Sequence, residues 1–167
     1  MIRFFGQPKY SYHHPDHLIG YELLLREWQE DRWCVPNDFD QFGADAIAEL
    51  LRLTLTALPD DLPLLSFNLD QRQFAAPQFI AELTRLATTL PHPEHLAVEL
   101  TERDEHIGLP QLTRAAAAYA AAGLRVCLAD VGTGANQPAV ALALMPYTTE
   151  YKFPLRSEQP TSELQSH

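Results

Sequence analysis

Several short apolar runs in this chain contain an acidic or amide side chain at or near one end. Of all features of the sequence, this pattern places the strongest limit on the fold. The run from Leu18 to Arg26 contains Glu22 among leucines, and three later runs finish on Asn68, Glu99 and Asp130. An unpaired ionised carboxylate in a protein interior costs several kcal/mol, so Glu22 requires a cation, a hydrogen-bond network or a metal. Four strand ends of this kind predict one shared site.

Strand-like and helix-like segments alternate along the chain. Apolar residues recur at helical spacing over residues 44–58 and 78–90, and Pro110 begins an Ala-rich helix that Gly123 ends. We expect strands over residues 2–12, 18–26, 62–68, 96–100, 124–130 and 148–153, a turn at 13–16, an ordered loop over 27–37 and a short helix from Asn136 and Pro138.

Apolar strands separated by helices predict an α/β protein with a parallel sheet covered by helices. The polar residues come at the C-terminal ends of the strands, where the catalytic groups of a barrel meet, so a TIM-type barrel is expected. An open doubly wound sheet is the alternative. Such a sheet usually has a glycine-rich phosphate loop after its first strand, and the sequence has none there.

Length and charge limit the remaining choices. A chain of 167 residues with 46% hydrophobic composition is sufficient for one compact domain. Its formal net charge of −10 argues against a nucleic acid polymer or an anionic membrane as a partner. The N-terminus lacks the apolar region of a signal peptide, so we expect a cytoplasmic protein. Cys34 and Cys127 are far apart in the sequence, so no disulfide framework is expected, and Cys127 within a predicted strand is expected to be a reduced, buried thiol.

The candidate site consists of oxygen donors. Carboxylate and amide ligands without Cys or His favour hard cations, so Mg²⁺ or Mn²⁺ is expected. Glu102, three residues after Glu99, can hold a neighbouring loop, and Lys152 on the last expected strand can orient water or balance phosphate charge. The histidines at positions 13, 14 and 17 are explained by a solvated turn, since the other ligands of a zinc site are missing.

Five motifs, in this order, resemble those of the EAL domain, the bacterial cyclic di-GMP phosphodiesterase. They are Gly20-Tyr21-Glu22-Leu23-Leu24-Leu25-Arg26, Ser66-Phe67-Asn68-Leu69-Asp70, Val98-Glu99-Leu100-Thr101-Glu102, Ala129-Asp130-Val131-Gly132-Thr133-Gly134 and Glu150-Tyr151-Lys152-Phe153. The resemblance extends over nearly all of residues 3–155. It implies a modified TIM-type barrel whose first strand runs antiparallel, in agreement with the hairpin expected over residues 2–26.

The resemblance also implies roles for individual residues. The implied metal ligands are Glu22, Asn68, Glu99 and Asp130. In the family, two metal ions activate a water that hydrolyses cyclic di-GMP to linear pGpG. Glu22 and Lys152 would act in catalysis, with Lys152 assisting the water, and Glu102 would brace the glycine loop. Arg26 and Leu24 would contact the dinucleotide. The expected partner is cyclic di-GMP, and a homodimer is possible.

The sequence departs from the family pattern at three places. Ala129 replaces the first Asp of the family's D-D pair, Val131 replaces a Phe, and Pro154 stands where an acidic residue is usual. The family also continues with further strands and helices after this point. We therefore expect residues 1–155 to form the N-terminal portion of an EAL domain, with an incomplete barrel and an exposed strand edge at 148–153. Residues 156–167 form a polar tail that is expected to be artefactual or disordered.

Three hypotheses for function follow. The first is a metal-dependent cyclic di-GMP phosphodiesterase. The second is a degenerate EAL domain that senses the dinucleotide or docks on a protein without hydrolysing it, and Ala129 favours this hypothesis. The third is an unrelated magnesium-dependent barrel enzyme, and the ordered motifs argue against it.

Overall fold

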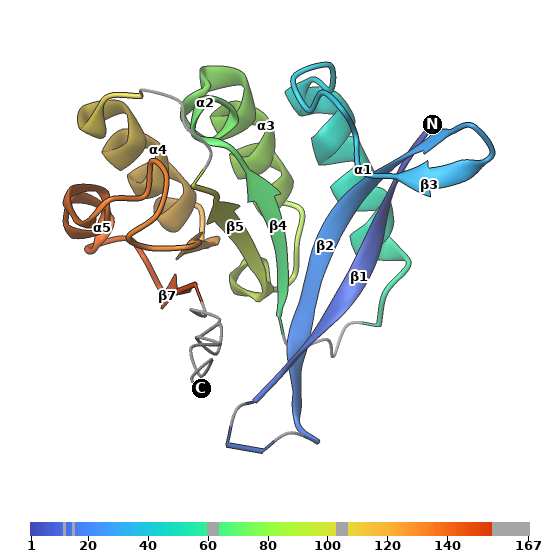
Figure 1. Cartoon of the computed structure of the whole chain (residues 1–167), viewed down its shortest axis with the longest axis horizontal. Coiled ribbons are helices and arrows are strands. Elements are labelled where there is room, and N and C mark those ends of the chain that lie inside the picture. Colours follow the sequence, from blue (N-terminus) through green and yellow to red (C-terminus); the bar gives the residue numbers. More distant parts are fainter. Residues whose placement is uncertain (12, 15, 60–63, 103–106, 155–167) are drawn as a thin grey trace, which may run out of the picture.

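The computed structural model describes residues 1–11, 13–14, 16–59, 64–102 and 107–154, and strands alternate with helices along these segments (Figure 1). The strands are β1 (Ile2–Tyr10), β2 (Leu18–Gln29), β3 (Arg32–Cys34), β4 (Leu65–Leu69), β5 (Leu96–Leu100), β6 (Arg125–Leu128) and β7 (Glu150–Tyr151). The helices are α1 (Ala44–Thr56), α2 (Gln71–Ala75), α3 (Pro77–Ala87), α4 (Leu109–Ala121) and α5 (Pro138–Leu144), with a 3₁₀ turn at Pro93–His95. No described helix is long and apolar enough to cross a membrane. The predicted tail at 156–167 lies outside the described residues.

The strands form one sheet in the order β1-β2-β4-β5-β6-β7, with β3 paired to β2. β1 and β3 run antiparallel to β2, and the other described pairs are parallel. The prediction of an α/β protein with a parallel sheet and an antiparallel first strand is therefore confirmed. β1 and β2 form the long hairpin that extends below the rest of the sheet in Figure 1.

The sheet is open at both edges. Within the described segments, β1 pairs with β2 alone and β7 pairs with β6 alone, so backbone hydrogen bonds do not close a barrel. This arrangement confirms the incomplete barrel expected from the sequence. β7 is shorter than the strand predicted over 148–153. Pro154 follows closely, and it has no amide hydrogen for another ladder bond.

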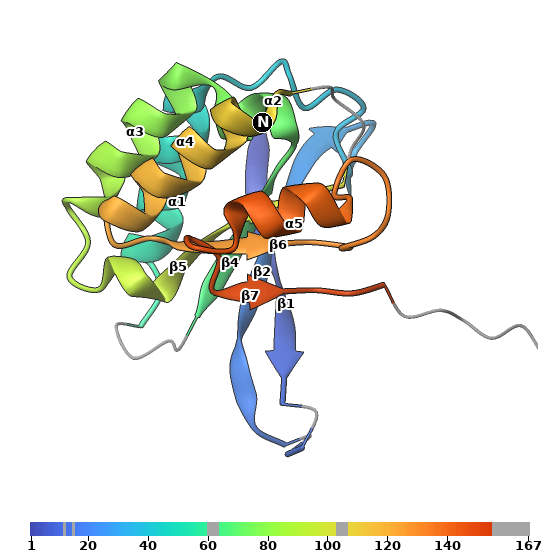
Figure 2. The same ribbon diagram turned by 90° about the vertical axis from the view of Figure 1, so that its left-hand side faces the viewer.

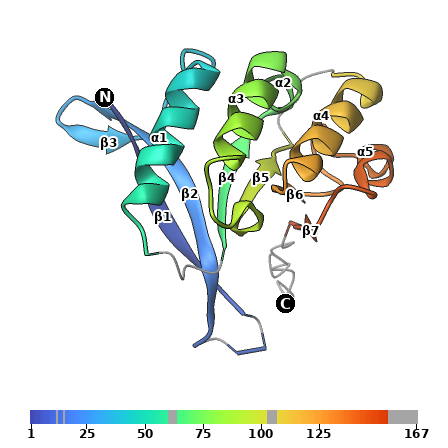
Figure 3. The ribbon, with the colours of Figure 1, turned by 180° about the vertical axis from the view of Figure 1, so that it is seen from behind.

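One face of the sheet is covered by helices. Figure 2 and Figure 3 show α1, α3 and α4 packed against this face, and Figure 3 shows them side by side. The strand residues buried beneath them are Leu65, Phe67, Leu69, Leu96, Val98, Leu100, Val126 and Leu128. Full burial of one such Leu, Val or Phe side chain stabilises the fold by about 1.5–3 kcal/mol. Burial of these residues against the helices therefore turns the alternate residues of each strand toward the opposite face of the sheet.

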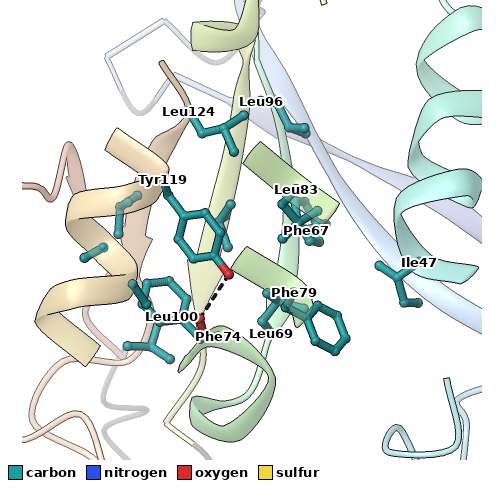
Figure 4. Close-up of a cluster of buried hydrophobic side chains, with 14 of the residues drawn as sticks. Ile47, Phe67, Leu69, Phe74, Phe79, Leu83, Leu96, Leu100, Tyr119 and Leu124 are labelled. Atoms are coloured by element: carbon teal, nitrogen blue, oxygen red, sulfur yellow. Dashed lines mark hydrogen bonds between the residues drawn. The ribbon is translucent and has the colours of Figure 1, made fainter. Parts of the chain in front are cut away.

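Phe74 of α2 and Tyr119 of α4 are joined within this core (Figure 4). The Tyr119 hydroxyl donates a hydrogen bond to the Phe74 carbonyl oxygen at 3.0 Å, and the two ring centroids lie 5.1 Å apart in an edge-on arrangement. Both side chains are fully buried. Because the hydroxyl has a partner, the tyrosine ring adds apolar contact without leaving a buried polar group unsatisfied.

The loop predicted over residues 27–37 is wrong in its first part. β2 continues into this segment and turns back as β3. Glu30 and Asp31 form the turn with φ values of 47° and 60°, and two such residues in succession are typical of a tight type I′ hairpin. Trp28 and Trp33 are cross-strand partners with ring centroids 5.3 Å apart. Their pairing favours a hairpin that apolar periodicity does not predict.

The short helix α2 is also absent from the sequence-based expectation. Asp70 begins it by accepting a hydrogen bond from the Gln73 amide at 2.8 Å. Such a cap satisfies one of the free amide groups of the first turn. Five residues are too few for apolar periodicity to show, so the capping aspartate was the available signal.

Candidate functional site

Polar side chains occupy the inner face of the sheet, opposite the helices. Successive residues of a strand point to opposite faces, so Glu22, Asn68 and Glu99 alternate with the buried apolar residues of β2, β4 and β5. In the strand register, Asn68 lies opposite Glu99, and Glu99 lies opposite Cys127. Lys152 directly follows β7. The parallel strands therefore bring these residues to one surface.

A glycine allows β2 to approach β4 just before Glu22. The Tyr21 amide donates to the Leu64 carbonyl oxygen at 2.8 Å, and a Cβ atom on Gly20 would lie 2.2 Å from the same oxygen. Any larger residue at position 20 would push the strands apart. The Gly-Tyr-Glu sequence thus sets the position of the Glu22 carboxylate relative to Asn68.

Four of the predicted site residues contact one another, and we call them the Lys152 cluster: Glu22, Asn68, Glu99 and Lys152. The Lys152 Nζ atom lies 2.5 Å from both carboxylate oxygens of Glu99 and 3.2 Å from Glu22 Oε2. The Asn68 amide donates to Glu22 Oε1 at 2.8 Å. The Glu99 side chain is only 3% exposed, whereas those of Glu22 and Lys152 keep 22% and 25% of their surface. Glu99 is thus shielded from solvent, whereas Glu22 and Lys152 remain accessible to it.

Burial and pairing act in opposite directions on these ionisable groups. Burial raises the pKa of the Glu99 carboxyl, and the Lys152 ammonium offsets only part of this rise. Burial also opposes ionisation of Glu22, but the Asn68 hydrogen bond and the Lys152 charge outweigh it and lower its pKa. Burial disfavours charge on Lys152, yet the two glutamates raise its pKa. Lys152 is therefore a stable cation between two carboxylates.

A second polar contact crosses the inner face between the two edges of the sheet. Lys9 on β1 lies 3.4 Å from Glu150 Oε1 on β7 and 3.4 Å from the Ser66 hydroxyl on β4. The Lys9 side chain is 14% exposed and that of Glu150 is 34% exposed, so solvent reaches this contact from the β7 side. Side chains therefore connect the edge strands although their backbones are not paired.

The loop after β6 is fixed by backbone contacts. A Cβ atom on Gly134 would lie 2.1 Å from the Glu102 carbonyl oxygen, and Gly134 has a φ of 45°. The Ala135 amide donates to the same oxygen at 2.9 Å. Glu102 thus contacts the glycine loop through its main chain. The contribution of its side chain to this loop, expected from the sequence, stays a prediction.

Asn136 holds the ends of β5 and β6 together. Its side-chain amide donates to the Leu100 carbonyl oxygen at 3.0 Å and to the Ala129 carbonyl oxygen at 2.7 Å. The residue is fully buried, and its main-chain carbonyl oxygen accepts from the Gly132 amide at 2.8 Å, whereas its side-chain oxygen has no partner among the described residues. Sequence reasoning assigned Asn136 only to a helix start, because a contact with distant carbonyl groups leaves no local pattern.

Asp130 and Ala129 lie at the C-terminal end of β6. Asp130 has a left-handed φ of 45°, and its carboxylate has no hydrogen bond or ion pair with the residues that the structure describes. Ala129 alternates with Cys127 and therefore faces the inner surface, where its methyl group offers no donor or acceptor. Of the four predicted metal ligands, Asn68 contacts Glu22 directly and Glu99 is joined to Glu22 through Lys152, whereas the Asp130 side chain has no contact with them among the described interactions.

A pocket of about 200 Å³ opens at the C-terminal ends of β2 and β4, and much of its lining belongs to the helix-covered face, including Leu25, Ile47 and Phe67. Its lining includes Leu24 and Arg26, the two predicted ligand contacts, together with Asn68. Asn68 therefore belongs both to the pocket and to the cluster. Arg26 donates to the Leu25 carbonyl oxygen at 2.8 Å, and this bond leaves several of its guanidinium hydrogens for a ligand.

The donor set of the Lys152 cluster fits a hard divalent cation. Oxygen atoms of Glu22 and Glu99 already surround one positive charge, and Asn68 adds an amide oxygen of the type that Mg²⁺ and Mn²⁺ accept. Ala129 supplies no ligand for a second ion. His92, Glu94 and His95, which precede β5, lie away from this cluster. Within the described segments, they form the one trio of His, Cys, Asp or Glu residues whose ligand atoms are all within 4.8 Å of one another.

An open α/β sheet with an antiparallel first strand, and with polar side chains on the inner face of its parallel strands, is the arrangement of an incomplete TIM-type barrel. The chain belongs to the EAL domain family, because the family model of the EAL domain matches residues 3–147. A search of curated proteins found no match.

Solved structures of EAL proteins share the fold. The Bacillus subtilis YkuI protein, in complex with substrate c-di-GMP and calcium, aligns with 17% identity and a TM-score of 0.71 over 96% of this chain and 42% of that chain. The PaMucR phosphodiesterase in a c-di-GMP complex aligns with 21% identity and a TM-score of 0.65, over 91% and 68%. Vibrio cholerae LapD bound to c-di-GMP aligns with 15% identity and a TM-score of 0.71, over 91% of this chain and 39% of that chain. The chain thus spans about two fifths of the Bacillus and Vibrio chains.

Proposed function

We propose that this protein binds cyclic di-GMP at the C-terminal face of its sheet and, with a divalent metal ion, hydrolyses it to linear pGpG. The observation that supports this proposal is the convergence of Glu22 from the middle of β2, Asn68 and Glu99 from the ends of β4 and β5, and Lys152 from the residue after β7. Three oxygen-donor side chains and one cation at the same point are suited to hold a metal and to stabilise charge on a phosphodiester. Related EAL proteins are seen with c-di-GMP bound.

Each residue of the site would have a distinct role. Glu22, Asn68 and Glu99 would hold a Mg²⁺ or Mn²⁺ ion, with Asp130 as a further ligand. The ion would supply Lewis-acid activation of the phosphodiester and of the attacking water. Lys152 would orient that water and balance negative charge, because its ammonium already lies between the two carboxylates. Glu102 would brace the glycine loop.

The substrate would be positioned by the adjoining pocket. Leu24 offers apolar contact to a base, and Arg26 offers guanidinium hydrogens to a phosphate. A protein with a formal net charge of −10 attracts no polyanion in general, so a dinucleotide must be bound by local cations of this kind. A pocket of about 200 Å³ is smaller than a cyclic dinucleotide, and part of the ligand would extend beyond it.

A second candidate function is a cyclic di-GMP sensor that binds without hydrolysis. Ala129 favours this alternative, because its methyl group faces the inner surface where a carboxylate would be needed for a second ion. Ground-state contacts with base and phosphate do not depend on that carboxylate. Binding would then persist while turnover is lost.

The test uses the full-length protein in the presence of Mn²⁺. Equilibrium binding of cyclic di-GMP is measured by calorimetry, and pGpG is quantified by chromatography. The enzyme hypothesis predicts binding and turnover, with turnover abolished by Glu99→Gln. Binding without turnover selects the sensor, and absence of both rejects the proposed ligand.

A further inference from the structure

Three aromatic side chains form a cluster beyond the Lys152 cluster, and we call it the aromatic rim: Phe5, Trp28 and Trp33. The Trp28 and Trp33 ring centroids are 5.3 Å apart, and those of Phe5 and Trp33 are 5.7 Å apart. Trp33 is thus enclosed by the other two rings. Phe5 and Trp28 remain 41% and 42% exposed, so each presents a free ring surface.

The strand register places the aromatic rim on the same surface as the candidate site. Glu22, Leu24, Arg26 and Trp28 follow one another at alternate positions of β2, so their side chains share the inner face. Phe5 is the cross-strand partner of Leu24, and Trp33 is the partner of Trp28. Arg26 and Trp28 are about 7 Å apart along the strand, a spacing that a phosphate and an attached nucleoside can bridge.

Two arginines lie opposite each other between the rim and the site. Arg3 and Arg26 are cross-strand partners, and neither has a carboxylate within 4 Å among the residues described by the structure. The Arg3 guanidinium lies 5.3 Å from the Trp33 ring centroid. Like charges in direct opposition destabilise a strand pair, and an anion held between them would remove that repulsion.

We infer that Arg3, Arg26 and the aromatic rim form a second nucleotide subsite, in which the arginines hold a phosphate and the exposed Trp28 ring stacks on a guanine base. The inference rests on the proposed function, since the guanine would belong to the same cyclic di-GMP that reaches the Lys152 cluster. Trp33 would act as a positioning residue, because its ring supports both Trp28 and the Arg3 guanidinium. Aromatic rings stack on every base, and arginine supplies the anion contact.

The experiment measures cyclic di-GMP affinity of the full-length protein and of three variants in calcium, an ion that is expected to slow turnover. Trp28→Ala removes the stacking ring and is expected to weaken binding roughly 5- to 100-fold. Arg3→Gln should weaken binding and reduce its salt dependence, since one phosphate contact is lost. Tyr10→Ala is the matched control: Tyr10 is an exposed aromatic residue at the far end of β1, and its loss should leave affinity unchanged.

Tryptophan fluorescence gives an independent readout, because both tryptophans of the chain belong to the aromatic rim. Saturating cyclic di-GMP should quench or shift the emission of the unmodified protein, and this measurement does not depend on whether a variant folds. Unchanged affinity in Trp28→Ala and Arg3→Gln, or unchanged emission on saturation, would reject the subsite while the proposed function stands. Absence of cyclic di-GMP binding by the unmodified protein would instead reject the proposed function and the subsite together.

Discussion

The Lys152 ammonium lies 2.5 Å from both carboxylate oxygens of Glu99, although 53 positions separate the two residues in the sequence. β5 and β7 are not neighbours, since β6 lies between them. The contact therefore depends on curvature of the sheet, which turns the side chains of β5 and the residue after β7 toward one point. The same curvature brings Lys9 of β1 to Glu150 of β7.

Replacement of this lysine is expected to destabilise the protein in a pH-dependent manner. Lys152→Met leaves the Glu22 and Glu99 carboxylates without their cation. We expect the free energy of unfolding to fall by about 3 kcal/mol near neutral pH. This value is at the lower end of the range for breaking a buried ion pair, because Lys152 is partly exposed. The pKa of Glu99, which burial already raises, then rises further, and Glu22 loses the ammonium charge that helps to lower its pKa. The folded variant binds more protons, so its stability falls as pH rises through that window.

Denaturant unfolding at pH 5 and pH 8 would check this prediction. The deficit of Lys152→Met relative to the unmodified protein should be larger at pH 8 and should shrink at pH 5, where the glutamates can be protonated. Arg52→Met is the control, since it removes a cation from an exposed pair with Glu49 on α1. An equal deficit at both pH values would contradict the electrostatic explanation.

Restoration of a carboxylate at position 129 is expected to raise hydrolysis more than binding. In Ala129→Asp, an additional oxygen ligand faces the inner surface next to the Lys152 cluster and improves metal retention. We expect pGpG production with Mn²⁺ to increase by at least about tenfold and cyclic di-GMP affinity to change little. Ala129→Asn has a similar shape without the charge and should gain less. Equal turnover in all three forms would show that Ala129 does not limit activity.

Loss of the Asn136 side chain is expected to loosen the junction of β5 and β6. Asn136→Ala leaves the Ala129 carbonyl oxygen without its side-chain donor, while the Leu100 carbonyl oxygen keeps the hydrogen bond from the Ala129 amide, at a cost of about 1 to 3 kcal/mol. Gln137→Ala is the neighbouring control, because Gln137 is exposed and should cost less than about 1 kcal/mol. Urea unfolding of both variants measures the difference, and similar values would disprove a special role for Asn136.

The two glycines of the loop after β6 provide a matched pair. Gly132 has a φ of 93° and open space around its Cβ position, whereas Gly134 has a φ of 45° and faces the Glu102 carbonyl oxygen. Gly132→Ala should therefore cost about 1 to 2 kcal/mol for backbone conformation alone. Gly134→Ala adds a steric conflict and should cost about 3 kcal/mol or more. If thermal denaturation ranks the two variants equally, the close approach to Glu102 is unimportant.

The free edge at β7 is expected to promote self-association when the 167-residue chain is expressed by itself. β7 pairs with β6 on one side alone within the described residues, and exposed strand edges template pairing with other chains. Phe153→Lys, at a position that is 68% exposed, should reduce this association. Light scattering and sedimentation measure it, and a monodisperse, cooperatively melting monomer would contradict the prediction.

The order of the elements and the residue types of the candidate site could be predicted from local sequence patterns. Apolar periodicity is a local property, so the strand at Leu96–Leu100 and the helix that ends near Gly123 were predictable from neighbouring residues. The oxygen-donor side chains at strand ends were visible for the same reason, and the five ordered motifs indicated the EAL family before the family model confirmed it.

Tertiary structure alone decided which of these residues contact one another. The side chains of Glu22, Asn68, Glu99 and Lys152 meet because register and sheet curvature bring these positions together on the inner face. The β3 hairpin, with its Trp28 and Trp33 pair, likewise depends on contacts across strands. Local sequence patterns report the preference of a segment for helix or strand, whereas register and curvature arise from packing between segments that are distant in the chain.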